Sequence, residues 1–149
     1  MPRVTVYQGR PAGRVPDRHL EQIHATRPDF LCLPEYFWVP PGAVTHADAG
    51  AMAPLAHAAV ESLSRELHCV VVGGSYVLES GGKLHNAALV YDRGRYAGEQ
   101  RKRWPTDRER ERGIEPATTT DVIVAGGVRL GIAICADVLH AETFTAMRA

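Results

Sequence analysis

The sequence predicts an α/β domain with a mixed sheet. In the first half of the chain, short apolar runs alternate with segments of helical periodicity, and in the second half apolar runs are separated by glycine turns. The first pattern is typical of parallel strands joined by helices, and the second of antiparallel hairpins. With 149 residues, 45% of them hydrophobic, the chain is long enough for one buried core. We therefore expect a single domain over residues 1–149.

The first half of the chain is expected to begin with a strand, a helix and a second strand. The run VTVY (residues 4–7) is apolar enough for a strand. After a connection rich in glycine and proline, DRHLEQIHA places Leu20 and Ile23 on one helical face, and Asp17 stands where a capping side chain is expected. The continuous apolar run DFLCLPE (residues 29–35) is typical of a strand covered on both faces.

The longest predicted helix spans residues 51–68. Its apolar residues recur at helical spacing, and Pro54 falls in the expected first turn, where a proline is tolerated. The residues of this apolar face are Met52, Leu55, Ala56, Ala59, Val60, Leu63 and Leu67.

The second half of the chain predicts strands joined by tight turns. CVVVGG (residues 69–74) is expected to be a buried strand, and SYVLES, KLHNAALVYD and RYAGEQ to be three antiparallel strands joined by glycine turns. DVIVAGGVRLGIAIC is expected to form a hairpin around Gly126 and Gly127. The strands FLCL, VVVGG and GIAI are apolar on both faces, yet only two good helices are available to cover them. We therefore expect one face of the sheet to lie bare unless further protein covers it.

Composition argues against several classes of partner. The formal net charge is zero, so nothing indicates binding to nucleic acid or to an anionic membrane surface. No apolar run approaches the length of a membrane span, and the N-terminal segment lacks the apolar core of a signal peptide. Three cysteines without a CxxC motif are expected to be free thiols in a reducing compartment. We expect a cytoplasmic protein that binds a small molecule.

The short motifs of several large enzyme classes are absent from the sequence. GGSYV lacks the last glycine of GxSxG, and there is no GxGxxG, phosphate-binding loop or HExxH. The seven histidines are scattered without the spacing of metal ligands. We expect no metal site.

Three chemically capable residues stand where a predicted strand meets a loop. Glu35 follows FLCLP, Lys102 follows RYAGEQR, and Cys135 follows LGIAI. Each alone has an ordinary explanation: a carboxylate at a strand end, a solvated lysine, or a buried thiol. Together they form a coherent set, because a thiol nucleophile needs a proton acceptor and an acyl-transfer intermediate needs a positive group at its oxyanion.

These residues and their surroundings resemble the carbon-nitrogen hydrolase, or nitrilase, superfamily, whose signature is Glu, Lys and Cys in that order. DFLCLPEYF is similar to the family's glutamate segment, LHNAALVYDRGRYAGEQRK to the hairpin that leads to its lysine, and GVRLGIAICADVLHAE to its cysteine segment. The resemblance implies a four-layer α-β-β-α sandwich. It also implies that residues 1–149 are a domain truncated just past the cysteine, which supplies roughly one half of that sandwich.

The resemblance further implies a reaction. Glu35 would take the proton of Cys135, which attacks a small amide or nitrile, while Lys102 and the backbone N–H of Ala136 stabilise the oxyanion. A thioester would form and then be hydrolysed, with no metal or organic cofactor. A second carboxylate often supports the lysine in this family, and here it would be Glu109 or Glu111; the sequence leaves both open. The family's habit of pairing subunits implies a homo-oligomer, and a complementing second half is the other implied partner.

Two alternatives remain open from the sequence. One alternative is a non-catalytic, truncated interaction module. The other is an acyltransferase, in which the acyl group of the thioester passes to an amine and the thiol is released. Among the thiols, we expect Cys32 and Cys69 to be packed within apolar strands. We expect Cys135 to be the reactive one, since an ammonium close by favours its thiolate.

Overall fold

The predicted mixed sheet is confirmed by a computed structural model that describes residues 1–39 and 45–148. Five strands pair in the order β1-β2-β3-β4-β5, and β1, β2 and β3 are parallel, whereas β4 is antiparallel to β3 and to β5. The strands are β1 (Val4–Val6), β2 (Phe30–Cys32), β3 (Val70–Ser80), β4 (Lys83–Asp92) and β5 (Arg95–Arg101). The parallel part and the hairpin part of the chain therefore meet at β3.

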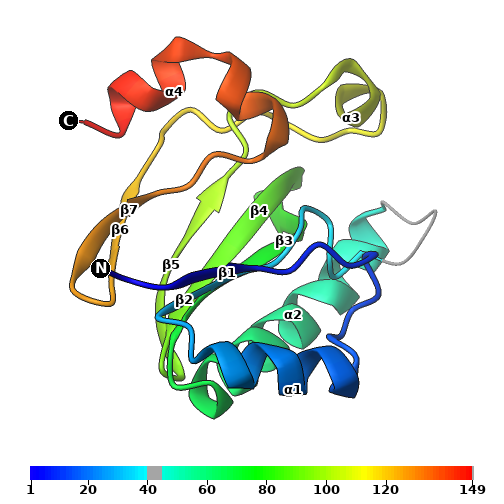
Figure 1. Ribbon diagram of the computed structural model, residues 1–149. Coiled ribbons are helices and arrows are strands. Elements are labelled where there is room, and N and C mark those ends of the chain that lie inside the picture. Colours follow the sequence, from blue (N-terminus) through cyan, green and yellow to red (C-terminus); the bar gives the residue numbers. More distant parts are fainter. Residues whose placement is uncertain (40–44, 149) are drawn as a thin grey trace.

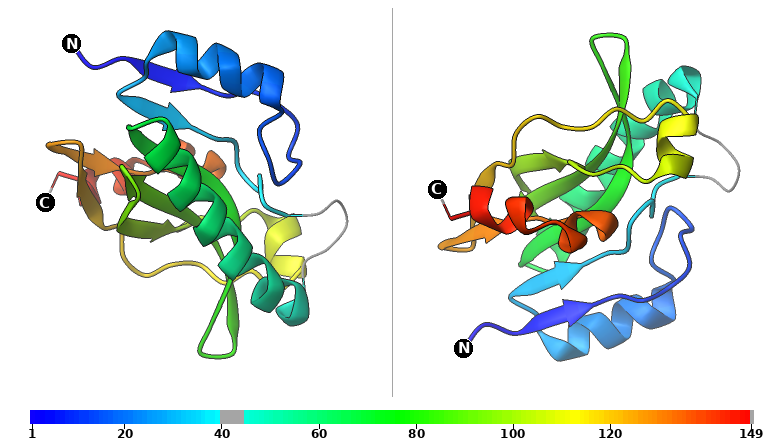
Figure 2. Two further views of the ribbon diagram at one scale, coloured as in Figure 1. Left: turned by 90° about the horizontal axis from the view of Figure 1, so that it is seen from below. Right: turned by 90° about the horizontal axis from the view of Figure 1, so that it is seen from above.

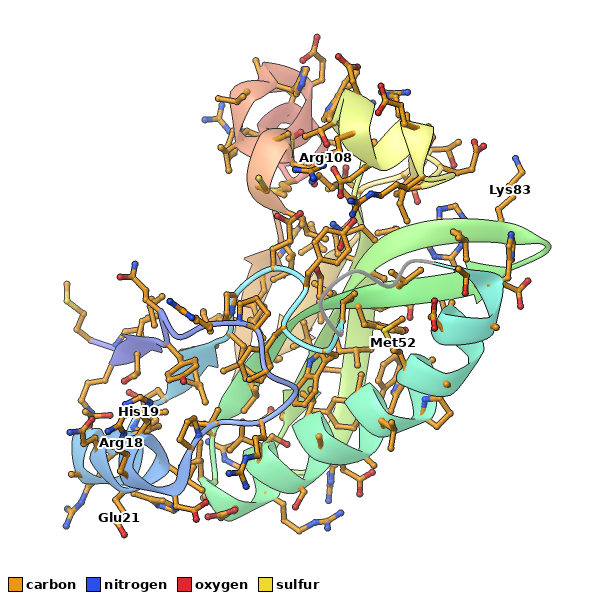
Figure 3. All side chains as sticks on the ribbon, turned by 90° about the vertical axis from the view of Figure 1, so that its right-hand side faces the viewer. Arg18, His19, Glu21, Met52, Lys83 and Arg108 are labelled. Carbon is orange, nitrogen blue, oxygen red and sulfur yellow. The ribbon has the colours of Figure 1, made fainter. Side chains whose placement is uncertain are left out.

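Two helices, α1 (Asp17–Thr26) and α2 (His46–Glu66), lie on one side of this sheet (Figure 1). The main core lies between them and the strands, where side chains such as Leu31 and Val60 have no exposed surface. Met52 lies between α2 and the sheet, whereas Arg18 and Glu21 of α1 point away from it (Figure 3). Burial of one apolar stripe per helix accounts for this layer.

The opposite face of the sheet is partly covered by a hairpin of β6 (Val122–Ala125) and β7 (Val128–Gly131). Ile123 and Ala125 of this hairpin pack against Phe30, Val70 and Val90 of the main sheet. The expectation of a bare face is therefore wrong for this part of the sheet, because the chain folds its own hairpin back over it. The expected strand GIAI is also wrong, since β7 ends at its first residue and residues 132–134 belong to no strand.

Three short helices complete the described chain: α3 (Asp107–Glu111), the 3-10 helix η1 (Cys135–Leu139) and α4 (Ala141–Ala146). The views from below and above show η1 and α4 on the side of the sheet away from α2 (Figure 2). The hairpin thus leads into a C-terminal segment that lies over the same face. No helix in residues 1–39 and 45–148 is long and apolar enough to cross a membrane.

Two helix starts differ from the sequence prediction. The helix α2 begins at His46, because the Thr45 side chain accepts a hydrogen bond from the Asp48 N–H at 3.2 Å and caps it earlier. Pro54 therefore lies inside the helix and not in its first turn, and Leu55 is 70% exposed where burial was expected. Asp17 is the first residue of α1 and makes no capping hydrogen bond.

The glycine pair Gly73–Gly74 does not end a strand, as the sequence suggested, but forms a bulge within β3. The pairing of β3 with β4 shifts register between Val72 and Ser75. Gly74 has a φ of +68°, and a Cβ there would lie 2.3 Å from the carbonyl oxygen of Pro34. The absence of a side chain lets β3 lie directly against the loop that follows β2.

Candidate active site

The loop after β2 holds Glu35 at the carboxyl end of that strand. Tyr36 adopts a φ of +55°, and its N–H donates a hydrogen bond to Ser75 Oγ at 2.8 Å. The Leu33 N–H donates to the Val72 carbonyl at 2.9 Å, and the Trp38 indole N–H donates to the Gly73 carbonyl. The bulged strand β3 therefore fixes the loop on both sides of Glu35.

Lys102 follows β5 and is brought to the same edge of the sheet. Because β5 runs parallel to β2, the residues that follow the two strands lie at one end of the sheet. The Lys102 side chain is only 1% exposed, and its Nζ lies 2.8 Å from Glu35 Oε1 and 2.7 Å from Glu109 Oε2. One buried ammonium thus joins two carboxylates.

Glu109 lies in α3, and its carboxylate accepts hydrogen bonds from several groups. The Tyr36 hydroxyl donates to Oε1 at 2.6 Å, and the Thr106 N–H donates to Oε2 at 2.9 Å as part of a capping box. Of the two carboxylates that the sequence left open, Glu109 therefore contacts Lys102. Glu111 is exposed on the same short helix, and no ion pair is found for it within the described part of the chain.

Asn86 joins the two carboxylates a second time, and the sequence analysis missed it. Its Nδ2 donates to Glu35 Oε1 at 2.8 Å and to Glu109 Oε1 at 2.9 Å, and its side chain is fully buried. Tyr36 was missed as well. For Asn86, the sequence did offer a signal: it stands inside the apolar run LHNAALV, and a buried amide needs hydrogen-bond partners.

The charges of this cluster stabilise one another. Burial alone would lower the pKa of Lys102, but the hydrogen bonds and charges of Glu109 and Glu35 outweigh it and raise that pKa. Burial likewise acts to raise the pKa of Glu109, yet hydrogen bonds from Lys102, Tyr36, Thr106 and Asn86 bring it down to about 2. At neutral pH the lysine is charged and Glu109 is a carboxylate.

Cys135 begins η1 and lies next to Glu35. Both residues line a cavity of about 110 Å³, whose other walls include the backbone of Gly74 and the side chains of Leu33 and Ile132. Cys135 is exposed and has a φ of +48°, a conformation that few non-glycine residues adopt. The geometry therefore presents the sulfur and a carboxylate to the same space.

Lys102 acts to lower the pKa of the Cys135 thiol, in the expected direction, but other effects outweigh it and the pKa is raised overall. The main cause is partial desolvation of the sulfur, although the residue as a whole is exposed, and the charge of Glu35 comes next. The Glu35 side chain beside the thiol raises the pKa further, and the backbone of Ala136 lowers it. Since Lys102 is already paired with two carboxylates, its charge does not dominate at the sulfur.

The other two thiols differ from Cys135 in exposure. Cys69 is buried, and burial is the main cause that raises its pKa to about 11. Cys32 is half-buried, and its pKa is also raised by burial. No three His, Cys, Asp or Glu side chains of residues 1–39 and 45–148 converge as metal ligands would.

Comparison with known proteins gives the family of this chain. Residues 17–149 match the family model for carbon-nitrogen hydrolases. The chain belongs to the carbon-nitrogen hydrolase family. A search of curated proteins found no significant match.

Solved structures of this family share the fold of the chain. The carbon-nitrogen hydrolase of Helicobacter pylori G27 matches with a TM-score of 0.71 at 22% identity, over 85% of this chain and 46% of that one. An amidase from Nesterenkonia sp. matches with a TM-score of 0.67 at 19% identity, over 96% and 59%. Nit3 of Saccharomyces cerevisiae, a nitrilase-superfamily member, matches with a TM-score of 0.64 at 16% identity, over 85% and 51%. The chain spans about half the length of these proteins.

Two structures of the Nesterenkonia amidase concern the small amide acrylamide. One of them is a double mutant in complex with acrylamide. Another shows the result of Michael addition of acrylamide at the active-site cysteine of that enzyme.

The lowered pKa of Glu109 predicts a loss of stability in acid. Its folded pKa of about 2 lies below the ordinary 4.5, so the carboxylate stabilises the fold fully above pH 4.5. This contribution, on the order of 3 kcal/mol, is lost as the pH falls through 4.5 toward 2. Urea unfolding at stepped pH measures it. Glu109→Gln should show a shallower decline over this range, and Glu111→Gln should follow the parent protein. A decline for Glu109→Gln as steep as that of the parent would contradict the assignment.

Proposed function

We propose that this protein hydrolyses a non-peptide carbon–nitrogen bond of a small amide or nitrile through a thioester on Cys135. The observation that supports it best is one cavity lined by both Cys135 and Glu35, with the Glu35 carboxylate held by Lys102. A nucleophile, a base and a positive group are the parts that acyl transfer requires. Membership of the carbon-nitrogen hydrolase family supports the same class of reaction.

In the proposed first step, Glu35 acts as the general base. Because the pKa of the Cys135 thiol is raised, the sulfur keeps its proton at neutral pH until a substrate is present. Glu35 then accepts this proton as the sulfur attacks the carbonyl carbon of an amide or the carbon of a nitrile. Lys102 and Asn86 both donate to Oε1 of Glu35, and these hydrogen bonds hold its carboxylate in place at the cavity that Cys135 lines.

In the following steps, charge develops on the substrate and the carbon–nitrogen bond breaks. Lys102 and the backbone N–H of Ala136 are the proposed donors to the oxyanion. Glu35 passes its proton to the nitrogen, so that an amide releases ammonia or an amine and leaves a thioester. A nitrile first gives a thioimidate, which takes up one water before ammonia leaves and the thioester remains. Water, activated by Glu35, then attacks the thioester, the acid leaves, and the proton returns to the sulfur. Glu109 is the proposed support that keeps Lys102 charged and in place. No step needs a cofactor.

Acrylamide is a reasonable first small amide to test, because a double mutant of the Nesterenkonia amidase was solved in complex with it. The cavity beside Cys135, at about 110 Å³, is small and partly apolar, which favours short aliphatic amides over large ones.

The cytoplasm remains the proposed location.

A homo-oligomer or a complementing second half is the proposed partner. Val4 and Val6 on the edge strand β1 are each 59% exposed, and Leu139 of η1 is 81% exposed. Val4 and Val6 lie on the same face of an edge strand, where unpaired backbone groups and exposed apolar side chains favour pairing with further protein. Sedimentation velocity should therefore show an assembly larger than one chain at tens of micromolar. A single monomeric species that binds no hydrophobic dye would contradict the pairing.

Substitutions at the three proposed catalytic positions test the reaction. Glu35→Gln, Lys102→Ala and Cys135→Ala should each lower kcat/KM for a small amide by about 10²–10⁴-fold or more, because each removes one part of the acyl-transfer machinery. Ammonia release measures the rate, and circular dichroism checks the fold. Glu111→Gln is the matched control and should keep the parent rate. A folded Cys135→Ala protein that retained a substantial fraction of the parent rate would end the nucleophile assignment.

A further inference from the structure

The Asp137 carboxylate joins two segments of the chain that are distant in sequence. The side chain is buried, with 1% of the residue exposed. Its Oδ1 accepts hydrogen bonds from the backbone N–H groups of Arg103 at 3.1 Å and of Trp104 at 2.7 Å. Its Oδ2 accepts from the backbone N–H of Ile134 at 3.0 Å. One rigid group thus holds the residues just after Lys102 and the residue just before Cys135.

We propose that Asp137 is a positioning residue that holds Cys135 in place beside Lys102 and Glu35. The catalytic part of this inference rests on the proposed function. A buried carboxylate is stable only if it is well hydrogen-bonded, and three N–H donors provide this. These donors come from the two backbone segments whose side chains form the site. Any movement of one segment relative to the other must therefore break at least one charged hydrogen bond.

Asp137 also closes the turn in which Cys135 lies. Its backbone N–H donates to the Ile134 carbonyl at 3.1 Å, while its Oδ2 accepts from the Ile134 N–H. Both polar groups of Ile134 are therefore bound by the same residue, with Cys135 in the middle of the turn. The φ of +48° at Cys135 is unfavourable for a residue with a side chain and persists only where its surroundings fix it.

A second contact joins the same two segments and is independent of Asp137. The Trp104 ring stacks on the His140 ring with centroids 4.0 Å apart and an angle of 13° between the planes. The Arg103 guanidinium lies 5.8 Å from the centroid of the Trp104 ring. This stack should keep the segments near each other when Asp137 is changed, so that a variant can fold and still lose the fine position of Cys135.

Asp137→Asn is the variant that separates positioning from folding. An asparagine puts a donor NH2 in place of one of the two carboxylate oxygens, so the backbone N–H groups of one segment lose their acceptor. The Cys135 turn should relax away from Glu35 and Lys102, the two charged groups that face the thiol. Asp17→Asn is the control, because Asp17 is an exposed aspartate that caps nothing.

The experiment measures iodoacetamide labelling of each cysteine against pH, together with turnover of a small amide. In Asp137→Asn, the raised pKa of Cys135 should fall toward the value of an ordinary thiol, so that Cys135 is labelled several-fold faster below that value. At the same time kcat should fall about tenfold or more, with a smaller change in KM. Cys69 should stay unlabelled, which shows that the core is intact, and Asp17→Asn should match the parent protein.

A folded Asp137→Asn protein with the parent's labelling profile at Cys135 would overturn the proposal. If the parent protein turned over no amide, the proposed function would fail while the labelling profile still tested the positioning. If Cys69 of Asp137→Asn is labelled rapidly, the variant has unfolded, because Cys69 is buried in the folded protein. Hydrogen exchange of the parent protein then tests the proposal. The amides of Arg103, Trp104 and Ile134 should then exchange slowly and with one common protection factor. Clearly different protection factors for the two segments would overturn the proposal.

Discussion

The buried ammonium of Lys102 is the group on which the arrangement of the site depends. With 1% of its side chain exposed, its charge would be strongly destabilising unless paired. Glu35 and Glu109 provide the pairing, and each comes from a different part of the chain. The loop after β2, the end of β5 and the short helix α3 must therefore converge on one point. Removal of Lys102 would leave the two carboxylates close together without a counter-charge.

The sheet makes this convergence possible. The strands β2 and β5 run in the same direction, so Glu35 and Lys102 emerge at the same edge although 67 residues separate them. Asn86 in β4 then reaches both carboxylates from the strand beside β5. The bulge at Gly74 brings the Glu35 loop close to β3. Backbone geometry and charge pairing therefore support each other: the strands bring the charged groups together, and the charges fix the loops.

Much of the sheet was predictable from the sequence, because periodicity and glycine turns report local structure. The mixed sheet and the β6–β7 hairpin were predicted correctly, whereas the bulge at Gly73–Gly74 was mistaken for a strand end. That error has a physical cause: the bulge depends on the contact of Gly74 with Pro34, which lies in a different part of the chain. Likewise, the early start of α2 depends on one capping side chain, that of Thr45.

The site was predictable in its residue types but not in its contacts. The positions of Glu35, Lys102 and Cys135 at the ends of predicted strands were visible in the sequence, and the structure brings Glu35 together with the other two. The choice of Glu109 over Glu111 needed the helical geometry of α3. The raised pKa of the Cys135 thiol could not be predicted, because it depends on partial desolvation of the sulfur and on the pairing of Lys102 with Glu35 and Glu109.

Trapping the covalent intermediate tests the role of Cys135 most directly. The protein would be mixed with a saturating short aliphatic amide, quenched in acid during turnover, digested and analysed by mass spectrometry. The acyl group of the substrate should be found on the peptide that contains Cys135, and it should disappear once the substrate is exhausted. Hydrolysis of the amide with no acyl group on Cys135, or with the acyl group on Cys32 or Cys69, would contradict the proposed mechanism.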